Sequence, residues 1–268
     1  MIDVDEIFSG SIPKLYETYL VPLIFEPYAK DLRQRLDSMR VSRILEVAAG
    51  TGVVTRALAT LENVSIVATD LNQAMLDEAA AVGTARPVGW QQADAMALPF
   101  PDGEFDAVVC QFGAMFFPDK AKAFSEIRRV LKPGGVFIFN VWDRISENEF
   151  ADSISTALEM VFPEDPPHFL VRTPHGYHDQ AAIGKDLTNG GFTKPPRITT
   201  IASRSRAASA RVPAFAYCHG TPLRSEIEAR DKSRLEEATD TATAALARRF
   251  GTSAVNGKIQ AHIITIEK

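Results

Sequence analysis

Two glycines and a carboxylate stand at a spacing that suits binding of a nucleotide-like ligand. Gly50 and Gly52 directly follow a short apolar run at residues 44–47, and Asp70 comes 20 residues after Gly50. Glycine is needed where the backbone turns sharply or lies against a ligand, because it has no side chain to clash. A helix expected over residues 55–61 would add free N–H groups and a partial positive charge. Asp70 is then placed to accept hydrogen bonds from ribose hydroxyls.

Asp70 has a second interpretation, as the cap of the helix that follows it. Its position at the end of a β-branched run, residues 64–69, favours the ribose role. The same acid would also serve NAD, so Asp70 alone does not distinguish between nucleotide cofactors. The NAD fingerprint requires glycine or alanine at the sixth position counted from Gly50, where this chain has Thr55. A P-loop is excluded because no Gly-Lys-Ser/Thr sequence occurs.

The glycine turn resembles the first motif of class I S-adenosylmethionine (SAM)-dependent methyltransferases, which reads acidic-x-Gly-x-Gly-x-Gly. Glu46, Ala48, Gly50 and Gly52 occupy these positions, with alanine in the first glycine place. The string from residue 92 to residue 143, with its Leu-Lys-Pro-Gly-Gly turn, is similar to the methyltransferase type 11 group, close to the quinone-biosynthesis methyltransferases. The resemblance covers about a hundred residues.

The resemblance implies a set of cofactor-binding residues. Asp94 would accept from the exocyclic amino group of adenine, and the N–H of Ala95 would donate to a ring nitrogen. The alternative for this pair is a plain surface turn, and the alternative for Met75 is packing rather than a wall for the ring. Gln111 and Phe112 leave the end of a fourth strand, at the ligand-binding edge of such sheets. The whole predicted set is Tyr19, Ala48, Gly50, Thr51, Gly52, Asp70, Leu71, Met75, Asp94, Ala95, Gln111 and Phe112.

The segment before the first core strand, residues 12–36, is expected to be a helix broken at Pro22 and Pro27. Its aromatic side chains favour packing onto the body of the protein. The other interpretation is a lid that closes over the ligand, in which Tyr19 would touch the cofactor.

The composition excludes several classes of function. Of the 268 residues, 46% are hydrophobic, enough for a sizeable core. The formal net charge is −5 without a long basic run, which disfavours nucleic acid as a partner. Two distant cysteines do not make a disulfide framework. No signal peptide and no apolar stretch of about 18 residues is visible, so we expect a cytoplasmic protein without a membrane span.

These observations predict an α/β fold, a Rossmann-like three-layer sandwich. Its mostly parallel seven-stranded sheet would carry an antiparallel C-terminal strand and a helical cap. The last two strands are expected at residues 198–201 and 260–267. One domain, residues 1–268, is predicted. Its core would comprise residues 40–143, 179–203 and 259–268, and its cap residues 1–39, 145–178 and 204–258.

The predicted function is transfer of a methyl group from SAM to a small-molecule acceptor by in-line displacement, mainly through positioning and desolvation. The spacing of histidines and cysteines indicates no metal site. One histidine could serve as a general base, but the sequence does not select it, so the catalytic residue is unassigned. The alternative is a sensor or partner subunit that binds the ligand without turnover, and an NAD-dependent enzyme comes third. The oligomeric state is open, with a homodimer among the choices.

Overall fold

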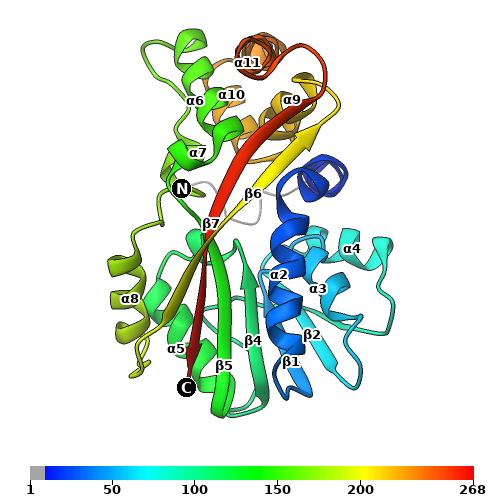
Figure 1. The fold of residues 1–268 in the computed structure, drawn as a ribbon, viewed down its shortest axis with the longest axis vertical. Coiled ribbons are helices and arrows are strands. Elements are labelled where there is room, and N and C mark those ends of the chain that lie inside the picture. The colour runs from blue at the N-terminus through cyan, green and yellow to red at the C-terminus, as the bar shows by residue number, and fades with distance from the viewer. Residues whose placement is uncertain (1–9) are drawn as a thin grey trace. The chain divides into compact units, whose positions relative to one another are not determined.

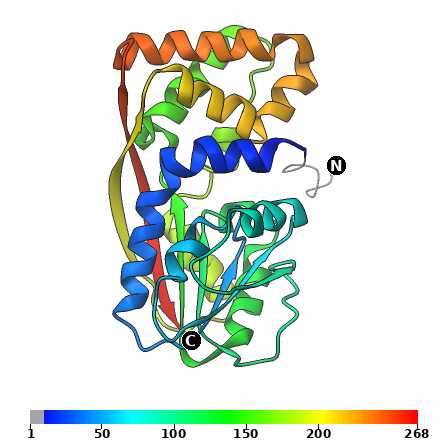
Figure 2. The ribbon, with the colours of Figure 1, turned by 90° about the vertical axis from the view of Figure 1, so that its right-hand side faces the viewer.

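The computed structural model describes residues 10–268, which form two compact units. The α/β unit comprises Glu26–Trp142, Tyr177–Ile201 and Ala261–Lys268. The helical unit comprises residues 10–25, Asp143–Gly176 and Ala202–Gln260. Figure 1 and Figure 2 show their elements in two views.

The sheet has seven strands in the order β3-β2-β1-β4-β5-β7-β6. Six strands are parallel and β7 is antiparallel, as in the Rossmann-like fold predicted from the sequence. β6 and β7 are longer than the sequence predicts. The strand bounds are β1 Arg43–Val47, β2 Ser65–Asp70, β3 Gly89–Gln92, β4 Phe105–Gln111, β5 Leu131–Trp142, β6 Arg197–Ala207 and β7 Val255–Glu267.

The central strands are apolar because helices cover both faces of the sheet. Ile44 and Leu45 of β1 and Val108 and Val109 of β4 are fully buried. The helix pair α2–α3 and the pair α5–α8 lie on opposite sides of the strands (Figure 1). The helices of this unit are α2 Glu26–Asp37, α3 Val53–Leu58, α4 Gln73–Val82, the short 3₁₀ turn η3 Ala114–Phe116, α5 Lys120–Val130 and α8 Gln180–Asn189.

Helix α5 shows how the local sequence makes these elements. Asp119 caps it, because its side chain accepts a hydrogen bond from the N–H of Lys122. Phe124, Ile127 and Val130 recur at helical spacing and are all fully buried. These three apolar side chains therefore determine which face of α5 is buried.

In the helical unit, α11 packs against both α6 and α9 (Figure 2), and α9 packs against η2. Ala238, Ala242 and Leu246 form the buried side of α11. The elements of this unit are α1 Ile12–Leu15, the π-helix η2 Tyr16–Phe25, η4 Ile145–Glu147, α6 Glu149–Val161, α7 Phe169–Arg172, α9 Arg211–Gly220, α10 Leu223–Asp231, η5 Lys232–Arg234 and α11 Leu235–Phe250.

The predicted helix breaks at Pro22 and Pro27 are wrong. Pro22 lies inside η2, and Pro27 lies in the first turn of α2. A proline within an α-helix collides with the carbonyl group four residues earlier. The wider turn of a π-helix moves that carbonyl group, so Pro22 is accommodated where an α-helix would be broken.

None of the helices within residues 10–268 combines the length and the apolar character needed to cross a membrane.

Candidate functional site

The turn after β1 is built from residues with left-handed backbone conformations. Ala48, Gly50 and Gly52 have φ angles of 55°, 57° and 82°. At Gly52, a Cβ atom would also come within 3.1 Å of both Ala79 and Trp90. Glycine is therefore required at position 52 for conformation and for space, and its backbone leads directly into α3.

Ala48 takes the first glycine place of the motif, and the structure shows why the methyl group fits. A Cβ atom built on Gly113 would lie 2.4 Å from the Cβ of Ala48. The methyl group of Ala48 thus faces the end of β4, where Gly113 leaves room for it. Alanine can replace the first glycine of the motif because residue 113, just after the neighbouring strand β4, is a glycine.

Asp70, at the end of β2, is hydrogen bonded to the glycine turn. Its Oδ2 accepts from the N–H of Gly50 at 2.8 Å, and its Oδ1 accepts from the N–H of Asn72 at 2.9 Å. Burial raises the pKa of Asp70, against the opposing effect of these backbone donors. The cap of α4 is Asn72, whose side chain accepts from Ala74, so the helix-cap role for Asp70 is wrong. Carboxylate oxygens have further lone pairs, which leaves Asp70 able to accept more hydrogen bonds.

The third strand end lies beside the second. Asp70 is in register with Gln92 of β3, and the carbonyl group of Asp70 accepts from the N–H of Ala93 at 3.0 Å. Asp94 follows at once, and its Oδ1 accepts from the N–H of Met96. The following Ala95 is buried. The ends of β1, β2 and β3 are therefore adjacent at one edge of the sheet.

Thr51 is a buried polar residue within the glycine turn. Its side chain is almost fully buried, and its hydroxyl group has no hydrogen-bond partner among residues 10–268. A buried hydroxyl without a partner costs about 1–3 kcal/mol. The hydroxyl of Thr51 is therefore a polar atom of this turn whose hydrogen bonding the described residues leave unsatisfied.

The end of β4 holds Phe112 in a strained conformation, with a φ angle of 51°. The backbone N–H of Phe112 donates to Oδ1 of the fully buried Asn140 at 2.9 Å. Its ring stacks on Trp142 with centroids 3.8 Å apart, and Tyr28 meets it edge-on. The neighbouring Gln111 accepts from the side chain of Asn140. Asn140 thus fixes both predicted residues at this strand end.

The other predicted residues have varied surroundings. Met75 is buried, and a Cβ atom on Gly50 would lie 3.6 Å from its terminal carbon, so Met75 packs beneath the turn. Leu71 is 39% exposed, and its carbonyl group accepts from Gln92. Tyr19 belongs to the helical unit, where its ring meets Phe215 edge-on at 5.2 Å. Its contact with the cofactor stays a prediction.

Glu46, the acidic residue of the motif, is buried beneath the turn. Its Oε2 accepts from the hydroxyl of Thr55 at 2.6 Å. Burial raises the pKa of Glu46 from 4.5 to about 8, although the hydrogen bond from Thr55 lowers it. The side chain is therefore mostly protonated and neutral at pH 7.

Replacing Glu46 with glutamine should change how stability depends on pH. Between pH 4.5 and about 8, the folded state holds a proton on Glu46 that the unfolded state releases. The stabilisation is complete below pH 4.5 and is lost as the pH rises through about 8. Glutamine mimics the protonated form and does not titrate. The free energy of unfolding of the natural protein should fall relative to that of Glu46→Gln, by at most about 1.4 kcal/mol per pH unit.

Urea unfolding at several pH values within this window measures the difference. Glu62→Gln is the matched control, because Glu62 is exposed. Unfolding free energies of Glu46→Gln and the natural protein that run parallel across the window would contradict the assignment.

Two buried histidines of the helical unit make hydrogen bonds within that unit. Nδ1 of His175 lies 2.8 Å from the carbonyl oxygen of Asp143. That oxygen can only accept, so Nδ1 of His175 carries the proton. His219 pairs with the hydroxyl of Thr239 at 3.0 Å, and burial lowers its pKa. These contacts fix the orientation of both rings and, at His175, leave Nε2 as the unprotonated nitrogen, so they do not assign a general base.

The sequence interpretation missed Gly113, Trp90 and Asn140 as parts of the site. Gly113 follows an expected strand and could have been noticed as a small residue at the ligand-binding edge. No sequence pattern indicates Trp90 or Asn140, because each contacts a site residue that is distant in the sequence. Trp90 approaches Gly52, and Asn140 holds Phe112.

Comparison with known proteins agrees with this geometry. A family described as "Methyltransferase domain" matches residues 45–139. A ubiquinone/menaquinone biosynthesis C-methyltransferase of Teredinibacter turnerae is 33% identical over 215 residues, which is 71% of this chain and 78% of the relative. The chain belongs to the class I SAM-dependent methyltransferases of the type 11 group. The methyltransferase family predicted from the glycine motif is thus confirmed.

Two further comparisons describe the extent of the likeness. A methyltransferase of the same description from Proteus mirabilis is 35% identical over 139 residues, and this chain spans 52% of its length. The solved structure of Haemonchus contortus phospholethanolamine N-methyltransferase 2, with phosphomonomethylethanolamine and S-adenosylhomocysteine, has a TM-score of 0.61 at 16% identity. The match covers 100% of this chain and 61% of that one and shows a shared fold.

The cofactor of this methyltransferase is SAM, and the residues at the strand ends fit it. The glycine turn offers backbone that a ligand can approach at Gly50, where a Cβ atom would meet only Met75 among residues 10–268, whereas Ala79 and Trp90 fill the space beside Gly52. The hydroxyl of Thr51 is buried without a partner among the described residues. Asp70 retains acceptor capacity at the adjacent strand end. These are the donors, acceptors and open backbone that an adenosyl group and its polar tail require.

Proposed function

We propose that the adjacent ends of β1, β2 and β3 hold the adenosyl part of SAM, and that the enzyme methylates a small molecule. The observation that supports this most directly is the hydrogen bond from the N–H of Gly50 to Asp70, which joins the glycine turn to the predicted ribose acceptor at 2.8 Å. Asp70 accepts from the ribose hydroxyls in this proposal. Asp94 accepts from the adenine amino group, and the N–H of Ala95 donates to the ring.

The chemistry is an in-line displacement. SAM supplies a methyl group already activated by a sulfonium centre. A bond forms from an electron pair of the acceptor to the methyl carbon while the carbon–sulfur bond breaks, and sulfur leaves with that bond's electron pair as a neutral thioether. The acceptor then loses a proton to a base. The protein's own contribution is to hold the two reactants about 3 Å apart, in line and away from water.

The names of the relatives indicate which acceptor to test first. They are described as C-methyltransferases of ubiquinone and menaquinone biosynthesis. A ring carbon of a quinone precursor is therefore the first acceptor class to offer. Other small nucleophiles with oxygen or nitrogen atoms form the comparison set.

Two measurements test the proposed function. Calorimetry with SAM, S-adenosylhomocysteine and NAD should show binding of both sulfur compounds and none of NAD. Methyl-tritiated SAM, incubated with the enzyme and quinone precursors, should pass its label to one of them. Tight SAM binding with no transfer to any acceptor in a small-molecule extract would support a sensor instead.

Replacing Thr51 with valine should separate stability from cofactor binding. Valine has nearly the same shape but no hydroxyl, so it removes a buried polar group that lacks a partner. We expect the cofactor-free protein to gain about 1 kcal/mol of unfolding free energy. The affinity for SAM should fall at the same time, because SAM would lose the hydroxyl of Thr51 as a hydrogen-bond partner.

Thermal unfolding with and without SAM measures both effects. Thr60→Val serves as the control, since Thr60 is exposed and bonds to the carbonyl group of Ala57. A Thr51→Val protein that gains stability and binds SAM as tightly as before would show that the hydroxyl does not contact the cofactor.

A further inference from the structure

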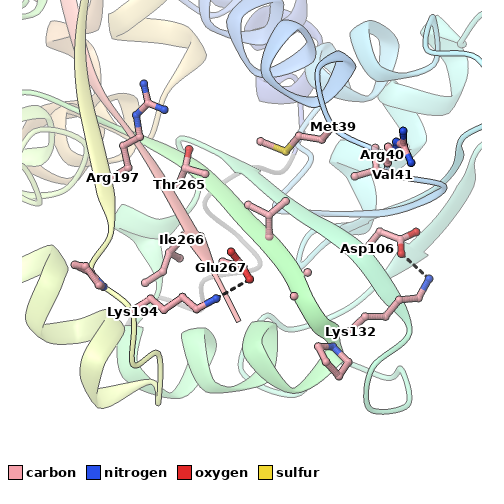
Figure 3. A pocket seen from close by; sticks show the side chains of 15 residues that line it. Met39, Arg40, Val41, Asp106, Lys132, Lys194, Arg197, Thr265, Ile266 and Glu267 are labelled. Carbon is pink, nitrogen blue, oxygen red and sulfur yellow. Dashed lines mark hydrogen bonds and ion pairs between the residues drawn. The ribbon is translucent and has the colours of Figure 1, made fainter.

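A hollow of about 640 Å³ opens at the edge of the α/β unit where β4 begins (Figure 3). It lies at the opposite edge of the sheet from the glycine turn. The strand β4 runs from Phe105 to Gln111, and at about 3.3 Å per residue this separates the two edges by roughly 20 Å. A molecule in this hollow would therefore touch neither the proposed cofactor site nor the end of β4 that carries Phe112.

Both acidic side chains of the hollow are already paired. Lys132 donates to Oδ1 of Asp106 at 2.6 Å, and Lys194 donates to Glu267 at 2.6 Å. Asp106 also accepts from Ser42 and from the N–H of Arg43. Although burial opposes it, these donors hold the pKa of Asp106 well below its usual range. Asp106 therefore stays ionised and neutralised by its own neighbours.

Two arginines of the hollow have no such partner. Arg40 and Arg197 are exposed, and within residues 10–268 neither makes an ion pair or a side-chain hydrogen bond. They stand on different sides of the hollow (Figure 3). The hollow thus carries a net positive charge in a chain whose formal net charge is −5. Such a local excess of one sign attracts ligands of the other sign.

The rest of the lining is largely apolar. Met39, Val41, Val136 and Ile266 contribute aliphatic surface, and Pro133 and Pro195 lie beside them. The volume falls within the range of small-molecule pockets, about 300–1,000 Å³. Guanidinium groups bind carboxylate and phosphate oxygens in a two-pronged geometry. An apolar floor between two unpaired guanidinium groups suits an anion that carries an apolar body.

We propose that this hollow is a second ligand site, which binds a small organic anion, a carboxylate or a phosphate on an apolar skeleton. The guanidinium group of Arg40 or that of Arg197 holds the charged group from its own side of the hollow, and the aliphatic side chains contact the skeleton. The site is separate from the chemistry of methyl transfer, so its ligand is neither the methyl donor nor the acceptor.

Calorimetry of the full chain tests the proposal with four probes. Phenyl phosphate and benzoate carry both the charge and the apolar body, and their comparison identifies the preferred anion. Inorganic phosphate carries only the charge, and benzyl alcohol only the ring. We expect one of the first two to bind at a single site, at least tenfold more tightly than inorganic phosphate or benzyl alcohol. The affinity should fall as salt is added.

The double variant Arg40→Ala/Arg197→Ala should weaken binding of that probe by at least tenfold and leave SAM affinity unchanged. Arg248→Ala removes one charge from an exposed position on α11 and should alter neither. Circular dichroism and the unchanged SAM affinity would show that the double variant is folded. Equal binding of the probe by the double variant and the natural protein, or no binding of either aromatic anion at millimolar concentration, would overturn the proposal.

Discussion

Replacing Asp70 with alanine should weaken SAM binding by about 1.5–3 kcal/mol, roughly ten- to a hundredfold. Two losses add up in this variant. The N–H of Gly50 loses the acceptor that holds the glycine turn, and the ribose hydroxyls lose the carboxylate proposed to bind them. Calorimetric titration with SAM measures the change directly.

Two further variants show which loss matters. Asp70→Asn keeps an oxygen that can accept from Gly50 but removes the charge, so it should bind SAM with intermediate affinity. Asp77→Ala removes an exposed carboxylate from the helix that follows, α4, and should bind SAM normally, since within residues 10–268 Asp77 accepts only from Gln73. An Asp70→Ala protein with unchanged SAM affinity would place the ribose elsewhere.

The fold was predictable because its strands and turns have strong local signals. The run Ile44–Leu45 is apolar on both faces, as a strand covered by helices must be. The alternating C-terminal strand was also found, but β7 begins at Val255, earlier than the pattern shows. Pro22 misled the prediction because proline rules assume an α-helix, and the chain forms a π-helix there.

The site was predictable only where its geometry follows from spacing along one segment. The distance from Gly50 to Asp70 is a property of one β-α-β unit, and the register of β1, β2 and β3 places those strand ends together. The contact of Ala48 with Gly113 joins residues on two strands that no local pattern connects. The bond from Phe112 to Asn140 is equally non-local. Contacts between residues on different strands leave no periodic pattern in the sequence, so they could not be predicted from it.

The close approach of Ala48 and Gly113 predicts a second large effect, a loss of stability when Gly113 is replaced. Replacing Gly113 with alanine would put its Cβ atom 2.4 Å from the Cβ of Ala48 and 2.8 Å from Sγ of Cys110. The methyl group of Ala48 is fixed to the backbone and cannot rotate away. We expect Gly113→Ala to lower the free energy of unfolding by about 1–3 kcal/mol. It should also weaken SAM binding, because the displaced residue belongs to the glycine turn.

A double-mutant cycle separates this collision from a general loss of packing. Ala48→Gly removes the opposing methyl group and relieves an alanine at a φ angle of 55°, so alone it should stay within about 1 kcal/mol of the natural protein. In the Gly113→Ala background it should restore most of the lost stability, with a coupling energy of about 0.5–3 kcal/mol.

A glycine elsewhere supplies the control for this cycle. Gly184 lies inside α8, and a Cβ atom added there meets no atom of residues 10–268 within 4 Å. Gly184→Ala should therefore stabilise the protein by about 0.5–1 kcal/mol, the gain from helix propensity alone. If Ala48→Gly failed to rescue Gly113→Ala, the cost would come from Cys110 or from the backbone, and the alanine in the motif would need another explanation. A full rescue, including SAM affinity, would show that the ends of β1 and β4 shape the cofactor turn as one packed pair.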